Sequence, residues 1–104
     1  MIDHCVGRIV QIVVERFHPL RVILFGSHAR GTARSDSDVD LLVVMSGVTD
    51  RRRAAVEIRR SLVGVPVPKD IVVATPEDLV RRGDCVGSIL RPALREGTIV
   101  YERS

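Results

Sequence analysis

Aromatic side chains are scarce in this sequence, and tryptophan is absent. Phe and Tyr make up only 3% of the residues, so the core must be built from Val, Ile, Leu and Ala. Proteins that bind single-stranded nucleic acids stack the bases on aromatic side chains, and this sequence does not support that mode of binding. Lysine is nearly missing as well, because Lys69 is the only one.

The basic excess is therefore almost entirely arginine, with 16 basic against 13 acidic residues and a net charge of +3. The arginines occur in short groups at 51–53, 59–60 and 81–82. Groups of this kind are typical of solvated helix faces, and so mild an excess is weak evidence for a nucleic-acid surface. Direct nucleic-acid binding is not expected.

Cysteines and long apolar runs are also scarce. Cys5 and Cys85 lie far apart and form neither a CxxC pair nor a Cys/His zinc pattern, so each is expected to be a buried free thiol. No apolar run approaches the ~18 residues needed to span a bilayer, and the first residues lack the layout of a signal peptide. These absences predict a cytoplasmic protein without a membrane partner. By length, residues 1–104 are expected to form one domain with a single core.

The hydrophobic pattern predicts an α/β (α+β) fold, with a small mixed sheet of about four strands and helices packed against it. The expected order is α-β-β-α-β-α-α-β. Apolar residues recur at helical spacing through residues 2–17 and again after Thr49 or Asp50, while Thr75 begins a short helix that ends near Gly83. A last helix is expected over 84–96, and Pro92 either kinks or restarts it. The expected strands span residues 21–25, 39–44, 69–74 and 98–101.

A glycine-rich turn followed by two aspartates lies between the first two strands. Asp38 and Asp40 project from the same side of an extended strand, because side chains alternate. Two such carboxylates need a cation, and hard oxygen ligands favour Mg²⁺ or Mn²⁺, with room for two ions. Asp70 opens the third strand, and it joins the other two carboxylates only if that strand lies beside the second.

Gly26 and Ser27 have the features of a phosphate-binding turn: close backbone approach, exposed N–H groups and a hydroxyl. Arg30 is near enough in the loop to contact a phosphate oxygen. Taken alone, a Gly-Ser pair more often only ends a strand and caps a turn. The aspartate pair of the motif could also be placed two residues earlier, at Asp36 and Asp38. That choice would leave the charge of Asp40 unpaired inside a strand.

A known family shares this combination. The segment Gly26-Ser27-x-Ala29-Arg30-Gly31, followed by Ser37-Asp38-x-Asp40-Leu41-Leu42-Val43, resembles the DNA polymerase β-like nucleotidyltransferases, and the short length resembles their minimal nucleotidyltransferase (MNT) group. The closing Glu96-Gly97-x-x-x-Tyr101-Glu102 is similar too.

The resemblance implies a role for each of these site residues. Asp38 and Asp40 would bind both metal ions, and Asp70 would be the third ligand and assist deprotonation of an acceptor hydroxyl. Gly26 and Ser27 would hold the β and γ phosphates of a nucleotide. Two further nucleotide-binding candidates are Arg30 and Ser37.

The resemblance also implies a reaction and a partner. The expected activity is metal-dependent transfer of a nucleoside monophosphate, AMP from ATP, to a hydroxyl of a partner protein. Minimal nucleotidyltransferases are commonly encoded beside a HEPN-domain protein, which makes this chain the expected antitoxin of a HEPN/MNT toxin–antitoxin pair. The alternative is a non-catalytic antitoxin or nucleotide-binding module that acts by complex formation. Small-molecule modification would need an acceptor domain, and homo-oligomerisation is left open.

Overall fold

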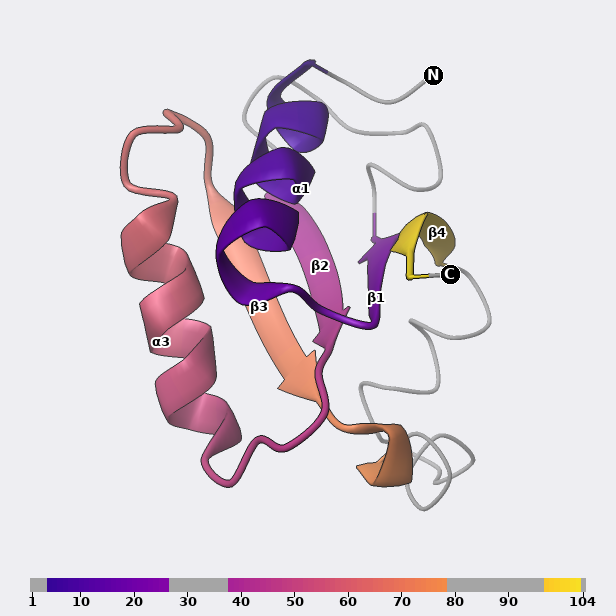
Figure 1. Ribbon diagram of the computed structural model, residues 1–104. Coiled ribbons are helices and arrows are strands. Elements are labelled where there is room, and N and C mark those ends of the chain that lie inside the picture. The colour runs from indigo at the N-terminus through magenta and orange to yellow at the C-terminus, as the bar shows by residue number, and fades with distance from the viewer. Residues whose placement is uncertain (1–3, 27–37, 79–96, 104) are drawn as a thin grey trace.

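The structure is a computed structural model, and it describes residues 4–26, 38–78 and 97–103. In this part of the chain, two helices lie side by side on one face of a four-stranded sheet (Figure 1). Helix α1 spans His4–Phe17 and helix α3 spans Arg51–Ser61. The strands are β1 (Arg21–Phe25), β2 (Val39–Val44), β3 (Lys69–Ala74) and β4 (Thr98–Glu102).

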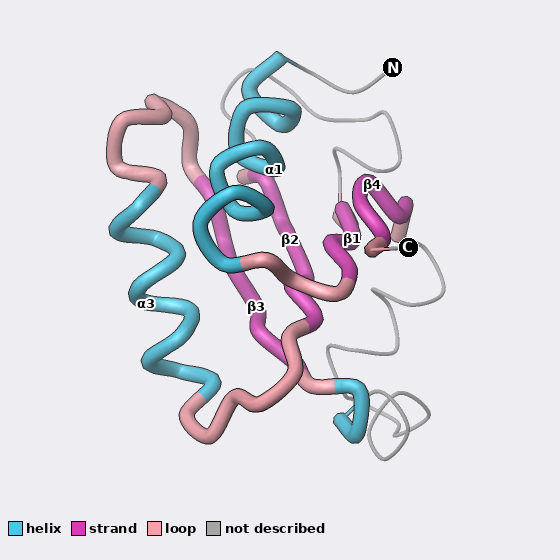
Figure 2. The backbone as a smooth tube through the Cα atoms, in the orientation of Figure 1, coloured by secondary structure: helices cyan, strands magenta, loops and turns pink. Residues whose placement is uncertain are grey.

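The sheet has the order β3-β2-β1-β4. Strand β1 pairs antiparallel with β2 and with β4, whereas β2 and β3 run parallel. Parallel neighbours need a crossover connection, and Figure 2 shows that α3 provides it between β2 and β3. This crossover returns the chain to the end of the sheet where β2 begins, so β2 and β3 both start there.

Each helix forms where its apolar residues share one face. In α1, Val6, Ile9 and Val13 are buried, and in α3 the buried residue is Ile58, followed by Leu62 just beyond the helix. The N-cap of α3 is Asp50, whose carboxylate accepts a hydrogen bond from the Arg53 backbone N–H at 3.0 Å. Such a bond satisfies one of the free N–H groups of a first turn.

The strands alternate between two apolar clusters. The helix face of the sheet is the one covered by α1 and α3. Its buried members are Val22, Leu24, Val39, Leu41, Val43, Ile71 and Val73. The opposite face has a second buried cluster, which consists of Ile23, Leu42, Val44 and Ala74. Because successive side chains point to opposite faces, Asp40 belongs with Leu42 on the opposite face, and Asp70 belongs there too.

The predicted fold class is confirmed, and three of the predicted strands have the bounds that the sequence indicated. Strand β4 is one residue longer than expected. Helix α1 is described from His4, and the predicted start at residue 2 lies outside the described residues. Only the start of the predicted helix after Thr75 is described. The expected helix over 84–96, with Pro92, lies outside the described residues. Among the described helices, none is long and apolar enough to cross a membrane.

Candidate active site

The parallel pairing of β2 with β3 aligns two of the three predicted carboxylates. Asp40 and Asp70 are partners in the register of these strands, and each is the second residue of its strand. A hydrogen bond of 2.9 Å from the Val39 N–H to the Pro68 carbonyl fixes the same alignment one step earlier. The condition that the third strand lies beside the second is therefore met. Asp40 and Asp70 stand on neighbouring strands at one end of the sheet.

Gly26 makes room for the carboxylate of Asp40. It follows β1, has a φ of +77°, and adjoins Phe25, which is the register partner of Asp40. A Cβ atom built on Gly26 would lie 2.3 Å from Oδ2 of Asp40 and 3.3 Å from its Cγ. No side chain fits at that distance, so the glycine lets the half-buried carboxylate of Asp40 lie against the backbone of the turn.

The carboxylate of Asp70 has a cationic partner from helix α3. Nη2 of Arg59 donates to Oδ1 of Asp70 at 2.8 Å, and both side chains are about half exposed, at 52% and 49%. Helix α3 packs on the helix face of the sheet, whereas Asp70 belongs to the opposite face. Strand β3 is an edge strand of the described sheet, so the long side chain of Arg59 reaches Asp70 past that edge.

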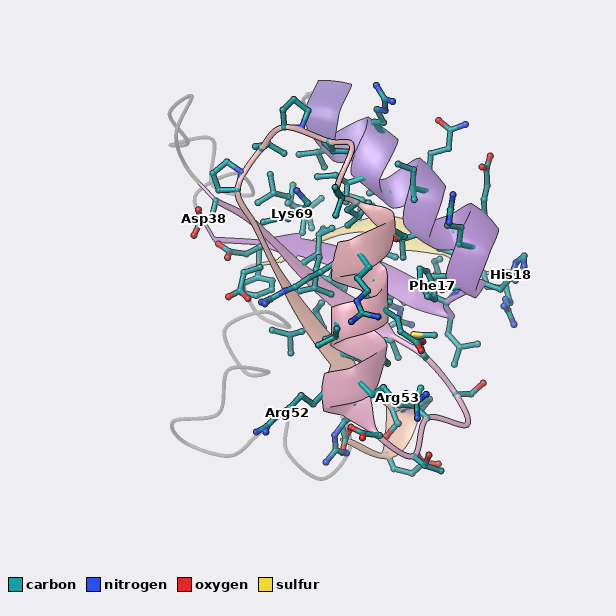
Figure 3. The ribbon with its side chains drawn as sticks, turned by 90° about the vertical axis from the view of Figure 1, so that its left-hand side faces the viewer. Phe17, His18, Asp38, Arg52, Arg53 and Lys69 are labelled. Atoms are coloured by element: carbon teal, nitrogen blue, oxygen red, sulfur yellow. The ribbon has the colours of Figure 1, made fainter. Side chains whose placement is uncertain are left out.

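Asp38 immediately precedes β2, and Lys69 is the first residue of β3. Asp38 is exposed, and it lies at the margin of the molecule opposite Phe17 and His18 (Figure 3). The ammonium of Lys69 donates to the carbonyls of Val65 and Val67, at 3.0 and 2.8 Å. Lys69 therefore holds the loop before β3 through these two carbonyls.

A further carboxylate is held at the other end of β3. Asp78 is buried, and its Oδ2 accepts from the Thr75 backbone N–H at 3.0 Å, while its own N–H donates to the Thr75 hydroxyl at 3.2 Å. Nη1 of Arg51 donates to both oxygens of Asp78 at 2.8 Å. The Thr75 backbone bond, and then the Thr75 hydroxyl and Arg51, lower the pKa of Asp78 against the opposing effect of burial. This reciprocal arrangement is the helix start predicted at Thr75, and it is structural.

The donor set suits a divalent cation in kind. Carboxylate oxygens are the ligands that Mg²⁺ and Mn²⁺ prefer, and Asp40 and Asp70 supply them side by side. In residues 4–26, 38–78 and 97–103, however, no group of three or more His, Cys, Asp or Glu side chains is arranged to hold a metal ion. The nucleotide-binding candidates Ser27, Arg30 and Ser37, and also Asp36, lie outside these ranges.

Sequence reasoning missed the roles of two arginines. All five arginines of α3 are exposed, as the sequence predicts. Two of them, Arg51 and Arg59, also pair with a carboxylate of or just after β3, whereas Arg52, Arg53 and Arg60 make no such pair with a described residue. The spacing of the arginines along α3 does not distinguish these two groups, because the partners come from another strand and depend on how α3 lies beside β3.

Comparison with known proteins gives the family. A family model described as a nucleotidyltransferase domain matches residues 6–99. A protein of Methanocaldococcus jannaschii, provisionally named a protein adenylyltransferase, is 37% identical over 112 residues, which cover 99% of this chain and 74% of that protein.

Three solved structures have a similar fold. A provisionally named nucleotidyltransferase from Sulfolobus solfataricus has a TM-score of 0.66 at 24% identity and covers 95% of this chain and 78% of its own. A toxin–antitoxin structure with AMP-PNP has a TM-score of 0.70 at 18% identity, and a mutant of the toxin–antitoxin MntA–HpeT has 0.67 at 16%; each covers 93% of this chain and 73% of its own.

At these identities the solved structures show a shared fold, and the family model and the archaeal relative go further because they extend along nearly the whole chain. As the glycine-rich turn and the aspartate pair predicted, the chain belongs to the nucleotidyltransferase domain family.

Proposed function

We propose that this nucleotidyltransferase transfers AMP from ATP to a hydroxyl of a partner protein, with Asp38, Asp40 and Asp70 binding two divalent cations, Mg²⁺ or Mn²⁺. One observation carries the assignment of the site. Asp40 and Asp70 are register partners on parallel strands, directly beside a glycine that leaves space for the Asp40 carboxylate. Packing alone does not explain two neighbouring carboxylates at the end of an apolar sheet.

The relatives support the choice of nucleotide and acceptor. The archaeal relative is named for the adenylylation of proteins, and one structure with the same fold was determined with AMP-PNP, an analogue of ATP. The MntA–HpeT mutant has two aspartates, two positions apart, replaced by glutamate. Asp38 and Asp40 have the same spacing. Because two structures with this fold are toxin–antitoxin assemblies, we propose a toxin of the HEPN class as the partner and acceptor.

The chemistry is an in-line displacement at the α-phosphate. The acceptor hydroxyl oxygen bonds to the α-phosphorus, the bond from that phosphorus to the bridging oxygen breaks, and pyrophosphate leaves. Divalent cations held by the carboxylates would neutralise the charge that develops on the phosphate oxygens. Asp70 takes the proton of the hydroxyl. Gly26 and Ser27 would hold the β and γ phosphates, Arg30 would contact a phosphate oxygen, and Ser37 would take part in nucleotide binding.

The test is transfer of label from α-labelled ATP to the HEPN-domain protein encoded beside this chain, in the presence of Mg²⁺. The wild-type chain should label that protein, and the double variant Asp38→Ala with Asp40→Ala should not. Glu57→Ala is the matched control, because Glu57 is an acidic residue on the exposed side of α3, where its side chain is 55% exposed. Full labelling by the double variant would refute the mechanism.

The same variants separate catalysis from neutralisation by binding. If the chain acts only by forming a complex, the double variant still rescues growth of cells that express the toxin. If adenylylation is required, the double variant forms the complex but does not rescue growth.

A further inference from the structure

Arg59 of α3 reaches Asp70, a proposed metal ligand. Its guanidinium is 2.8 Å from Oδ1 of Asp70. Among the other arginines of this helix, Arg51 binds Asp78, and Arg53 is 3.8 Å from Glu57 on the helix surface. Arg60 is exposed and makes no ion pair with any described residue. Arg59 and Arg60 are therefore adjacent arginines with the same charge and different surroundings.

The position of Asp70 explains why a cation is needed there. Asp40 and Asp70 are register partners, and like charges on neighbouring strands repel each other. The Arg59 guanidinium offsets this repulsion from the edge of the sheet. The guanidinium also donates a hydrogen bond to Oδ1 of Asp70. A carboxylate oxygen of this kind is the atom that a metal ion would take as a ligand. A divalent cation shared by Asp40 and Asp70 must compete with Arg59 for this carboxylate, and the two positive charges repel each other.

We propose that Arg59 is a built-in counter-ion of Asp70, which weakens the binding of divalent cations at the Asp40–Asp70 pair and stabilises the two carboxylates until a cation binds. This inference rests on the proposed function, because it requires Asp70 to be a metal ligand. It assigns to α3, the crossover helix, a part in setting the metal affinity of the site.

The test compares the full-length wild-type chain with Arg59→Gln, Arg59→Lys and Arg60→Gln. Mn²⁺ is titrated into each protein, and free Mn²⁺ is followed by electron paramagnetic resonance. Removing a half-exposed ion pair should tighten Mn²⁺ binding by about two- to five-fold in Arg59→Gln. Arg60→Gln should bind as the wild type does, and Arg59→Lys, which keeps the charge but not the planar donor group, should lie between them.

A second comparison tests whether Arg59 acts through Asp70. In an Asp70→Asn background, Arg59→Gln should no longer change the Mn²⁺ affinity. Without metal, Arg59→Gln should lower the melting temperature of the otherwise wild-type chain, but it should not lower that of the Asp70→Asn variant. The melting temperature also shows that each variant is folded.

Four results would count against these ideas in different ways. Equal Mn²⁺ affinity of Arg59→Gln and Arg60→Gln overturns the counter-ion role alone, and so does weaker binding by Arg59→Gln, which would mean that Arg59 holds Asp70 ready for the metal. If the wild-type chain binds no Mn²⁺, or if Asp38→Ala with Asp40→Ala binds it equally well, the proposed metal site fails, and the counter-ion role fails with it.

Discussion

Replacement of Gly26 by alanine tests whether the turn after β1 fixes the position of Asp40. The new methyl group would stand 2.3 Å from Oδ2 of Asp40, where real contacts of a Cβ atom are essentially never shorter than 3.0 Å. The carboxylate must therefore retreat by roughly 1 Å to reach ordinary van der Waals contact. The φ of +77° adds strain of its own, because an L-residue in the left-handed region costs roughly 1–2 kcal/mol.

Gly47 separates these two effects. Its φ is +72°, nearly that of Gly26, but a Cβ atom built there meets nothing within 4 Å. Gly47→Ala thus introduces the backbone strain without the clash. Backbone strain should lower the stability of both variants, by about 5–10 °C in Tm for a domain of this size, and the clash with Asp40 should lower that of Gly26→Ala further. Only Gly26→Ala displaces the carboxylate, and a misplacement of about 1 Å in a reacting group can cost about 100-fold in rate.

The assay is adenylylation of the partner protein, together with Mn²⁺ affinity and thermal unfolding. Gly26→Ala should lower the rate of labelling by about 100-fold and weaken Mn²⁺ binding, whereas Gly47→Ala should change neither. In an Asp40→Ala background, Gly26→Ala should have no further effect on Mn²⁺ affinity. The reasoning is refuted if the two glycine variants lose activity equally, because backbone strain would then explain the whole effect.

Two further predictions concern stability. Asp78→Asn should lower the free energy of unfolding by about 1–3 kcal/mol at pH 7. The folded-state pKa of Asp78 lies below its ordinary value of 3.8. The stabilisation is therefore present above that value and is lost as the pH falls through the folded-state pKa. Urea unfolding should show a smaller difference in unfolding free energy between wild type and variant at pH 3 than at pH 7, and a constant difference would contradict this. His18 follows α1 with a φ of 49°, so His18→Gly should raise the stability by about 0.5–1 kcal/mol, whereas His18→Ala, melted in parallel, should not.

The strands could be predicted from the sequence because each is short, apolar and bounded by turn residues. Val39–Val44 and Lys69–Ala74 have the predicted bounds. The sequence offers Thr49 or Asp50 as the N-cap of α3, and the structure selects Asp50. These features depend on local chemistry, which the order of residues contains.

The ion pairs of α3 could not be predicted in the same way. Whether Arg59 or Arg60 faces Asp70 depends on the rotation of α3 about its axis and on how far β3 lies from it. Local spacing does not contain that information. The pairing of Asp40 with Asp70 could be predicted only on the condition that β3 lies beside β2, which the sequence does not decide.

The register of β3 connects the core to the proposed chemistry. Ile71 and Val73 lie on the helix face, in the same buried cluster as Ile58 and Leu62. A slip of one residue would turn these two side chains away from the helices and would move Asp70 to the helix face, under α3. The apolar residues thereby select the one register in which Asp70 lies beside Asp40 on the face opposite the helices, within reach of Arg59. The position of the third carboxylate is thus a consequence of core packing, although no core residue takes part in the reaction.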